Sequence, residues 1–162
     1  MHQQLIEWSG DLGSDITFFL SRGSAYCTGR GEVMTPINPP PFADGVKVCI
    51  VKPSVGLSTP AVFKSLDYDM LSKLNPEEVL DKFCKEGVMV DDEYYINDLE
   101  PPAFKVVPEL KELKAELEKV NGFERVMISG SGTSIFCIGE AEDKDAFMGA
   151  FGNRVDLVVV EN

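Results

Sequence analysis

The order of strand and helix patterns along residues 46–162 restricts this chain to few folds. β-prone runs and helical patterns alternate there as strand, helices, strand, strand, helix, strand. Two split βαβ repeats in this order form a four-stranded antiparallel sheet with helices on one face, the ferredoxin-like arrangement. We therefore predict an α+β, ferredoxin-like fold. The expected strands are 46–51, 125–129, 134–139 and 155–160, and the expected helices are 59–66, 76–85, 108–120 and 143–151.

Local start and stop signals favour these helices. Pro60 and Pro76 take first-turn positions, where the missing amide hydrogen is not needed, and Asn75 can cap the second helix. In the third helix, leucines at 110, 113 and 117 recur at helical spacing before Asn121-Gly122 ends it. The pattern predicts an apolar face that packs on the sheet.

A proline-rich segment separates this region from a smaller N-terminal piece. Asn38-Pro39-Pro40-Pro41-Phe42 cannot continue a sheet, because proline lacks the amide donor that strand pairing uses. Before it we expect a short helix over 2–9. A hairpin of strands 24–28 and 33–37 follows, turning at Gly29-Arg30-Gly31. The sequence predicts two pieces, residues 1–40 and residues 46–162.

The charge of the chain limits its partners. A formal net charge of -12 argues against nucleic acid and anionic membranes, since both call for clustered Lys and Arg. No apolar run reaches the roughly 20 residues that a membrane-spanning helix needs. A phosphate-bearing ligand would need positive partners, which we expect from a metal ion and backbone amides, and from a part of the protein outside this chain.

The cysteines do not form a metal-binding pattern. The four cysteines are scattered singly and the chain has one histidine, so we expect no zinc site. Cys49 and Cys137 fall within apolar strand patterns, where a reduced thiol behaves as a small hydrophobic side chain. Asp91-Asp92-Glu93 reads as a solvated loop, with a divalent ion as the alternative.

The first candidate functional segment is Gly13-Ser14-Asp15, followed by Phe18-Phe19. Partial desolvation beside two aromatic rings would raise the pKa of Asp15, as a general base or a substrate-orienting carboxylate requires. The alternative is structural: Ser14 or Asp15 caps a short helix over 16–20.

The second candidate is Ser129-Gly130-Ser131-Gly132-Thr133-Ser134, between two apolar strands. Its glycines let backbone amides approach a ligand closely and its hydroxyls add donors, an arrangement that suits phosphate oxygens. The alternative is a plain hairpin with a glycine-rich turn.

Two further segments each have a functional and a structural interpretation. Phe63 lies one helical turn after Thr59, so one hydroxyl and one aromatic face could meet a flat ligand ring; alternatively, Phe63 is a core residue of a short helix. Asn97, Asp98 and Glu100 precede two prolines, and we interpret them as a helix start.

Together these segments resemble the GHMP small-molecule kinases, most closely the 4-diphosphocytidyl-2-C-methyl-D-erythritol kinases. Residues 13–19 and 25–32 are similar to the family stretch "GSDxPFF…GxAxxxGxGE". Residues 58–63 resemble "STPxVF", residues 97–100 resemble "NDLE", and residues 127–134 resemble the third GHMP motif. The four matches stand in the family's order and cover nearly the whole chain, in a form similar to plant or algal sequences.

The resemblance implies ATP-dependent phosphorylation of the cytidine diphosphate substrate in isoprenoid precursor synthesis, with Mg²⁺ screening the phosphates. Asp15 would orient or deprotonate the attacking hydroxyl, and Thr59 and Phe63 would hold the substrate. The phosphate and substrate cleft would be lined by Gly130, Ser131, Gly132 and Thr133. Residues 1–40 would be a remnant of the N-terminal GHMP domain and residues 46–162 the C-terminal domain. The location would be the plastid, or the cytoplasm in a bacterium.

The chain also departs from the family. Thr17 replaces the usual proline, and neither the family's early lysine nor its "PxxxGLGGGSS" phosphate loop occurs. We expect this chain alone to bind ATP poorly, to turn over slowly or not at all, and to associate through open strand edges. The alternative function is a non-catalytic ferredoxin-like module that binds a small ligand or a partner. A homoserine- or mevalonate-type kinase is disfavoured by the "STPxVF" and "NDLE" matches.

Overall fold

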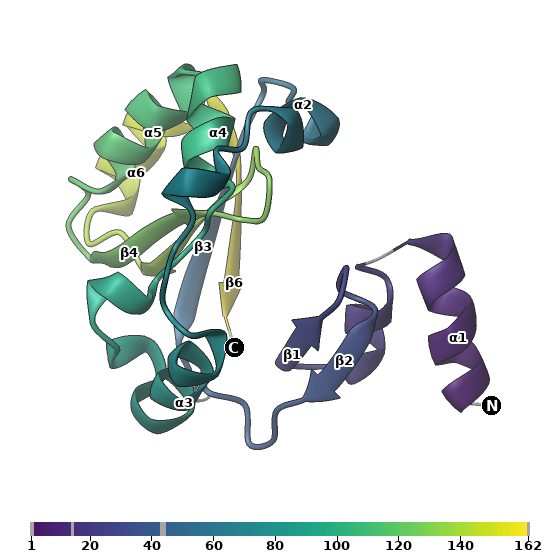
Figure 1. Cartoon of the computed structure of the whole chain (residues 1–162). Helices are drawn as coiled ribbons and strands as arrows, with labels where there is room; N and C mark the ends of the chain where they lie inside the picture. Colours follow the sequence, from purple (N-terminus) through teal and green to yellow (C-terminus); the bar gives the residue numbers. More distant parts are fainter. Residues whose placement is uncertain (1, 14, 43–44, 162) are drawn as a thin grey trace. The chain divides into compact units, whose positions relative to one another are not determined.

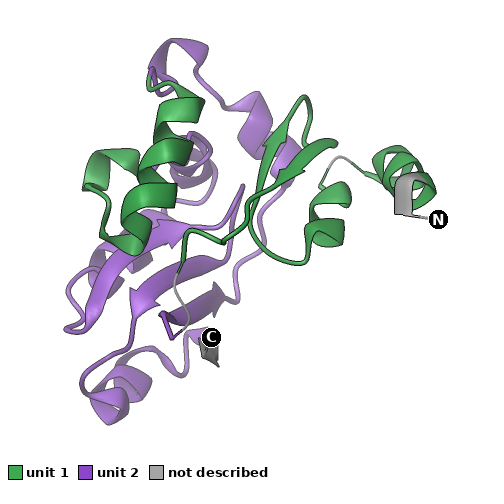
Figure 2. Cartoon of the chain, turned by 90° about the horizontal axis from the view of Figure 1, so that it is seen from below, with its two compact units in different colours: residues 1–43, 74–94 green, residues 44–73, 95–162 purple. Residues whose placement is uncertain are grey.

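The chain folds into two compact units. The computed structural model describes residues 2–13, 15–42 and 45–161. Unit 1 consists of Met1–Ala43 and Leu74–Tyr94, and unit 2 of Asp44–Lys73 and Tyr95–Asn162, as coloured in Figure 2. The segment 74–94, which we expected in the second piece, therefore groups with the N-terminal residues. Whether the units correspond to the two expected kinase domains stays a prediction.

Unit 2 is built on an antiparallel sheet with the strand order β4-β5-β3-β6. The first strand of the unit therefore lies between its third and fourth, which is the ferredoxin-like order. The sequence prediction of this fold is confirmed. The strands are β3 (Lys47–Pro53), β4 (Phe123–Ile128), β5 (Ile135–Gly139) and β6 (Val155–Glu161).

The helices of unit 2 supply its hydrophobic core. Figure 1 shows α4, α5 and α6 along the same face of the sheet. Leu110, Leu113 and Leu117 of α5 are buried against strand residues such as Val51 and Ile135, as their spacing predicted. The helices are α2 (Thr59–Lys64), α4 (Glu100–Val106), α5 (Glu109–Leu117) and α6 (Lys144–Phe151), and the 3-10 helix η2 covers Tyr68–Met70.

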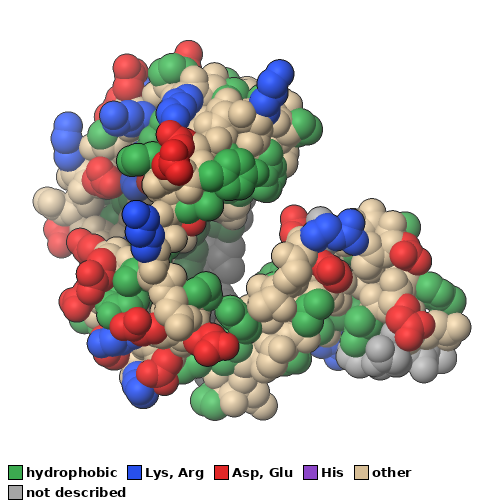
Figure 3. Space-filling model, in the orientation of Figure 1, with side chains coloured by type: hydrophobic (Ala, Val, Ile, Leu, Met, Phe, Trp, Pro, Cys, Tyr) green, Lys and Arg blue, Asp and Glu red, His purple; other side chains and the backbone are tan. Residues whose placement is uncertain are grey.

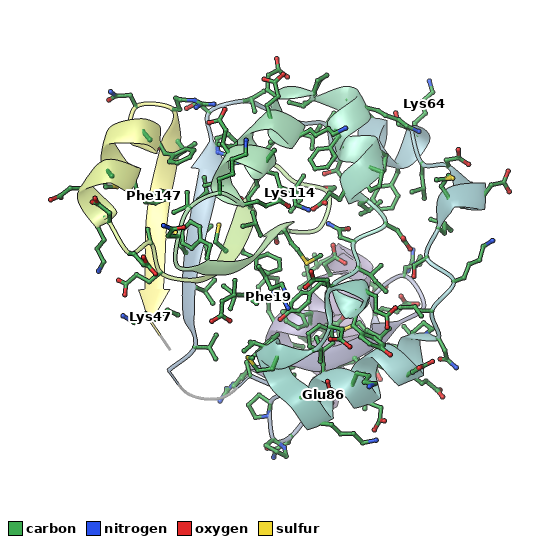
Figure 4. The ribbon with its side chains drawn as sticks, turned by 90° about the vertical axis from the view of Figure 1, so that its left-hand side faces the viewer. Phe19, Lys47, Lys64, Glu86, Lys114 and Phe147 are labelled. Carbon is green, nitrogen blue, oxygen red and sulfur yellow. The ribbon has the colours of Figure 1, made fainter. Side chains whose placement is uncertain are left out.

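Aromatic packing joins α6 to the sheet. The Phe147 ring centroid lies 5.4 Å from that of Phe123 on β4 and 5.1 Å from that of Phe151. Figure 4 shows the labelled Phe147 side chain between α6 and the strands. Edge-to-face contacts of this kind add to the free energy gained from burial of the rings.

The two central strands carry buried thiols. Cys49 of β3 and Cys137 of β5 are register partners, and both are free and buried, as expected from the sequence. Burial and the nearby Cys49 raise the pKa of Cys137 to about 12. These cysteines therefore act as apolar core residues rather than as nucleophiles.

Unit 1 combines a two-stranded hairpin with short helices. β1 (Ala25–Thr28) pairs antiparallel with β2 (Val33–Pro36), which confirms the predicted hairpin. The hydroxyls of Ser9 and Thr17 lie 2.9 Å apart and are buried, so they tie the first helix to the next turn. The helices are α1 (His2–Leu12), η1 (Thr17–Ser21), α3 (Pro76–Glu86), η3 (Gly87–Met89) and η4 (Asp92–Tyr94).

The start of α3 follows the expected chemistry, whereas Ser58, the N-cap residue of α2, makes no side-chain cap bond. Asn75 caps α3 by accepting a hydrogen bond of 2.9 Å from the Glu77 amide, and Pro76 opens the helix. None of the helices in the described part of the chain has the length and apolar character needed to span a bilayer.

Removal of a core leucine should destabilise unit 2. Leu117 is 0% exposed in the core cluster, so Leu117→Ala should lower the free energy of unfolding by about 2–5 kcal/mol through lost burial and the cavity left behind. Met148 of α6 is 51% exposed, and Met148→Ala should change it by about 0.5 kcal/mol or less. Urea denaturation of the three proteins measures both effects. Equal losses for the two variants would contradict this core assignment.

Candidate functional site

The loop between β4 and β5, residues 129–134, forms a closed hairpin turn. The Ser129 amide donates to the Ser134 carbonyl over 2.8 Å, and the Gly132 amide donates to the Ser129 carbonyl over 2.9 Å. Gly130 and Gly132 have φ angles of 54° and 93°, which L side chains rarely adopt. The glycine positions therefore permit this turn. A hairpin satisfies both interpretations of the loop, so its role as a phosphate nest stays a prediction.

The two glycines of this loop have different surroundings. A Cβ on Gly132 would lie 3.0 Å from Leu57 Cδ2 and 3.4 Å from Ile128 Cγ2, so this residue is packed against unit 2. A Cβ on Gly130 would meet no atom within 4 Å. The loop is thus anchored at Gly132 and open at Gly130, where a ligand can approach the backbone.

Asn97 fixes the loop from the segment before α4. Its side-chain amide donates hydrogen bonds of 2.8 Å to the carbonyls of Ile128 and Gly130. Its oxygen accepts a bond of 3.0 Å from the Leu99 amide, which holds the amide group in this orientation. Asn97 thus ties the segment before α4 to both the end of β4 and the glycine turn.

Glu100 makes a second tie to the same strand end. One of its carboxylate oxygens accepts a hydrogen bond of 3.0 Å from the Ile128 amide. The other pairs with Lys114 of α5 over 2.5 Å, and both side chains of this pair are mostly buried. Figure 4 labels Lys114 among the helices of unit 2. This mostly buried ion pair holds the carboxylate in place.

The interpretation of residues 97–100 as a helix start is therefore correct but incomplete. Helix α4 does begin at Glu100. Apart from the match to the "NDLE" element, nothing in the sequence indicates the hydrogen bonds that join Asn97 and Glu100 to Ile128, which lies 31 and 28 residues later. We call these two side chains, with Lys114, the loop brace.

Helix α2 carries Thr59 and Phe63 to the same region of unit 2. The Thr59 and Ser131 hydroxyl oxygens lie 2.9 Å apart, so the first residue of α2 contacts the glycine loop directly. Phe63 is 53% exposed, whereas the neighbouring Val62 is 0% exposed. The alternative that Phe63 is a core residue is therefore wrong, and Val62 takes that role. An exposed ring remains available to a planar ligand.

Thr133 and Lys52 form a contact that the sequence did not suggest. The Lys52 ammonium donates a hydrogen bond to the Thr133 hydroxyl, and Thr133 is only 2% exposed. Lys52 is the penultimate residue of β3, which pairs with the strand that leaves the loop. The structure thus places a cation beside residues 129–134 in unit 2.

Asp15 belongs to unit 1, whereas the loop residues 129–134 belong to unit 2. Its side chain is exposed, so unit 1 does not itself provide the desolvation that we expected. Helix η1 has Ile16 as its N-cap residue and shows no side-chain cap bond, so Asp15 does not cap this helix. The other capping candidate, Ser14, lies outside the described residues. Burial and the nearby Asp15 carboxylate raise the pKa of Cys27, so the two side chains are neighbours.

Charged side chains of both signs lie on the face of the molecule shown in Figure 3. In Figure 3, acidic and basic groups alternate with apolar ones on the face shown. Asp91, Asp92 and Glu93 are exposed, as predicted, but Asp92 and Glu93 lie in the 3-10 helix η4 and not in a loop. Among the described residues, no group of three or more His, Cys, Asp or Glu side chains is placed to hold a metal ion.

Unit 2 also has an apolar cavity of about 260 Å³. Arg154 at this cavity is paired with Glu116 over 2.7 Å, so its charge is already neutralised. Residues of β3, α5 and the turn before β6 line the cavity: Pro53, Ser54, Val55, Glu109, Leu110, Leu113, Arg154 and Val155. The cavity offers one hydroxyl, that of Ser54, and a cation that is already paired, whereas several hydroxyls and the Lys52 ammonium gather at the glycine loop, so we favour the loop as the functional site.

Residues 85–155 match the family model described as GHMP kinases C terminal. A chloroplastic 4-diphosphocytidyl-2-C-methyl-D-erythritol kinase from Mentha piperita is 44% identical over 142 residues, which are 86% of this chain and 34% of that protein. The enzyme of that name from Protochlamydia amoebophila is 41% identical over 155 residues, 94% of this chain and 49% of that protein. The chain thus spans between a third and a half of the length of these relatives.

Solved structures agree with these matches. A crystal structure of 4-(cytidine 5'-diphospho)-2C-methyl-D-erythritol kinase superposes with a TM-score of 0.73 at 27% identity, covering 96% of this chain and 55% of that one. A homoserine kinase from Cytophaga hutchinsonii superposes with a TM-score of 0.52 at 18% identity, covering 87% of this chain and 48% of that one, which shows a common fold alone.

Loss of the loop brace should loosen the glycine loop. Asn97→Ala leaves the Ile128 and Gly130 carbonyls without their side-chain donor, which should cost about 1–3 kcal/mol of stability. Amide hydrogen exchange at residues 129–133 should become faster than in the unchanged chain. Asn153→Ala, at an exposed turn residue, is the matched control and should leave that exchange unchanged. Protection of the loop amides that survives Asn97→Ala would show that the brace does not hold the loop.

Proposed function

We propose, from the premise that this chain carries the C-terminal domain of a GHMP kinase, that it is part of an enzyme that phosphorylates 4-diphosphocytidyl-2-C-methyl-D-erythritol with ATP. The observation that carries the proposal is the similarity over 86–94% of the chain to kinases of that name from plants and a bacterium. The exposed Phe63 and the open glycine loop fit a ligand with a flat ring and phosphates.

The cytidine end of the substrate would bind at α2. Phe63 offers an exposed aromatic face, and a base stacked on such a ring gains about 1–3 kcal/mol. The Thr59 and Ser131 hydroxyls, 2.9 Å apart, share one hydrogen between them and leave the other free to donate to the ligand. This pair would fix the ligand at the junction of α2 and the loop.

The diphosphate of the substrate would lie against the loop. Gly130 leaves its outer side open, so the backbone can approach phosphate oxygens, while Gly132 and Thr133 anchor the turn. The loop brace keeps this surface in one conformation before the ligand arrives, which reduces the entropy lost on binding. Gly130, Ser131, Gly132 and Thr133 are proposed in this role.

Asp15 is proposed as the catalytic residue. Its exposed carboxylate would orient the attacking hydroxyl of the substrate and accept its proton as the hydroxyl oxygen bonds to the γ-phosphorus of ATP, the bond from that phosphorus to the bridging oxygen breaks and ADP leaves. Mg²⁺ bound to the ATP phosphates would lower their negative charge, and an ion carried by the nucleotide needs few protein ligands. Most of the ATP contacts would come from the part of the relatives that this chain does not span.

The cellular role follows the named relatives. The plant enzymes are named chloroplastic, which supports a plastid location and a place in isoprenoid precursor synthesis if the chain comes from a plant or an alga. A cytoplasmic location would apply to a bacterial source.

Catalysis through Asp15 is testable in a chimera. Joined in frame to the N-terminal part of the Mentha piperita kinase, this chain should phosphorylate the cytidine diphosphate substrate with ATP, whereas the chain alone should turn over slowly or not at all. Asp15→Asn should lower kcat by about 100-fold or more, because the amide cannot accept the proton. Product formation is followed by ³¹P NMR.

Asp11→Asn provides the control, since Asp11 is an exposed carboxylate four residues earlier, on α1. It should leave kcat within about twofold of the unchanged chimera. If the chimera folds and the chain binds the substrate without phosphorylating it, the alternative of a non-catalytic binding module is preferred. If Asp15→Asn retains full activity, the catalytic assignment is wrong.

A further inference from the structure

A nucleotide diphosphate needs a positive partner, and the net charge of -12 makes such a partner scarce in this chain. The sequence alone led us to expect that the cations would come from a metal ion or from outside the chain. The structure instead places one ammonium group at the glycine loop, that of Lys52.

We propose that Lys52 is the phosphate-binding cation of this loop and that its ammonium binds a diphosphate oxygen of a nucleoside diphosphate. The inference rests on the proposed function, which supplies the class of ligand. It adds a residue that belongs neither to the family motifs nor to the candidate site residues found in the sequence. Thr133 acts in it as a positioning residue.

The contact with Thr133 sets the direction of the Lys52 side chain. Asp156 of β6 is the register partner of Lys52, yet the ammonium donates its hydrogen bond to the Thr133 hydroxyl on the loop side. Thr133 is buried, and its loop is hydrogen-bonded to Asn97 of the brace, so packing and hydrogen bonding both support the position of this acceptor. The ammonium is therefore held beside the loop before any ligand binds.

The remaining hydrogens of the ammonium suit a phosphate. An ammonium has three N–H donors. Within the described residues, Lys52 donates only to the Thr133 hydroxyl, and no carboxylate lies within ion-pair distance of it. Two donors and the full positive charge are thus left for an anion. Charge-assisted bonds from an ammonium to phosphate are about twice as strong as neutral ones.

Other cations of unit 2 lack this combination. Lys47, at the start of β3 and labelled in Figure 4, pairs with Glu140. Hydrogen bonds from Lys144 and Lys47 lower the pKa of Glu140 to about 2, so that carboxylate stays charged and keeps both lysines engaged. Lys114 belongs to the brace and is paired with Glu100. Lys52 alone among these lysines donates to a neutral loop hydroxyl.

Calorimetric titration of the full chain tests the proposal. Wild type should bind cytidine 5'-diphosphate and, more weakly, inorganic pyrophosphate. Lys52→Gln should weaken the affinity for both phosphate ligands by about tenfold, because one charge-assisted bond is lost. The affinity for cytidine, which has no phosphate, should be unchanged. Lys52→Arg keeps the charge and should recover most of the affinity for both phosphate ligands.

The matched control is Lys111→Gln, which removes the same charge from an exposed position on α5. It should leave all three affinities unchanged, and thermal unfolding should confirm that every variant folds. The proposal is overturned if wild type binds neither phosphate ligand, if Lys52→Gln binds them as tightly as wild type, or if Lys111→Gln loses as much affinity.

This test is separate from the test of catalysis. If Lys52→Gln weakens phosphate binding tenfold but the chimera is inactive, the proposed phosphate site is supported and the proposed kinase function is rejected. If the chimera is active but its affinity for the substrate is the same with and without Lys52→Gln, the proposed kinase function is supported and the role of Lys52 is rejected.

Discussion

The candidate site depends on one constraint: the Asn97 side chain donates hydrogen bonds to the end of β4 and the glycine turn, and the Glu100 carboxylate accepts one from the end of β4. These bonds connect the start of α4 with both polar groups of Ile128 and with the Gly130 carbonyl. Lys114 of α5 pairs with Glu100, so the position of Glu100 depends on how α5 packs on the sheet. Through this pair the packed helix supports the loop. A glycine-rich turn, flexible by composition, is thereby kept in one conformation that presents its open side.

The site in unit 2 then arises from three elements that meet at this turn. Helix α2 contributes the Thr59 hydroxyl and the exposed Phe63 ring, the loop contributes Ser131, and β3 contributes Lys52. Each group is suited to a different part of the nucleotide that we propose as the ligand: a ring can stack, hydroxyls can donate, and an ammonium can attract phosphate. An acidic chain can bind an anionic ligand in this way, because one correctly placed cation matters more than net charge.

The sequence predicted local features well and long-range contacts poorly. The hairpin of β1 and β2, the leucine spacing of α5 and the sheet order followed from turn residues and periodicity. Residues 97–100 were interpreted as a helix start, but the next helix was expected over 108–120, so the separate helix α4, whose first turn tolerates its two prolines, was given no bounds. Lys52 was missed because the direction of a lysine side chain depends on an acceptor eighty-one residues away.

Chemical-shift mapping of the isotope-labelled chain during titration with cytidine 5'-diphosphate tests the central claim most directly. The account predicts that the largest amide shifts fall on residues 130–133 and on Thr59 and Phe63, in a saturable manner. Shifts concentrated around the apolar cavity near Pro53 and Val155, or no shifts in a folded chain, would contradict it.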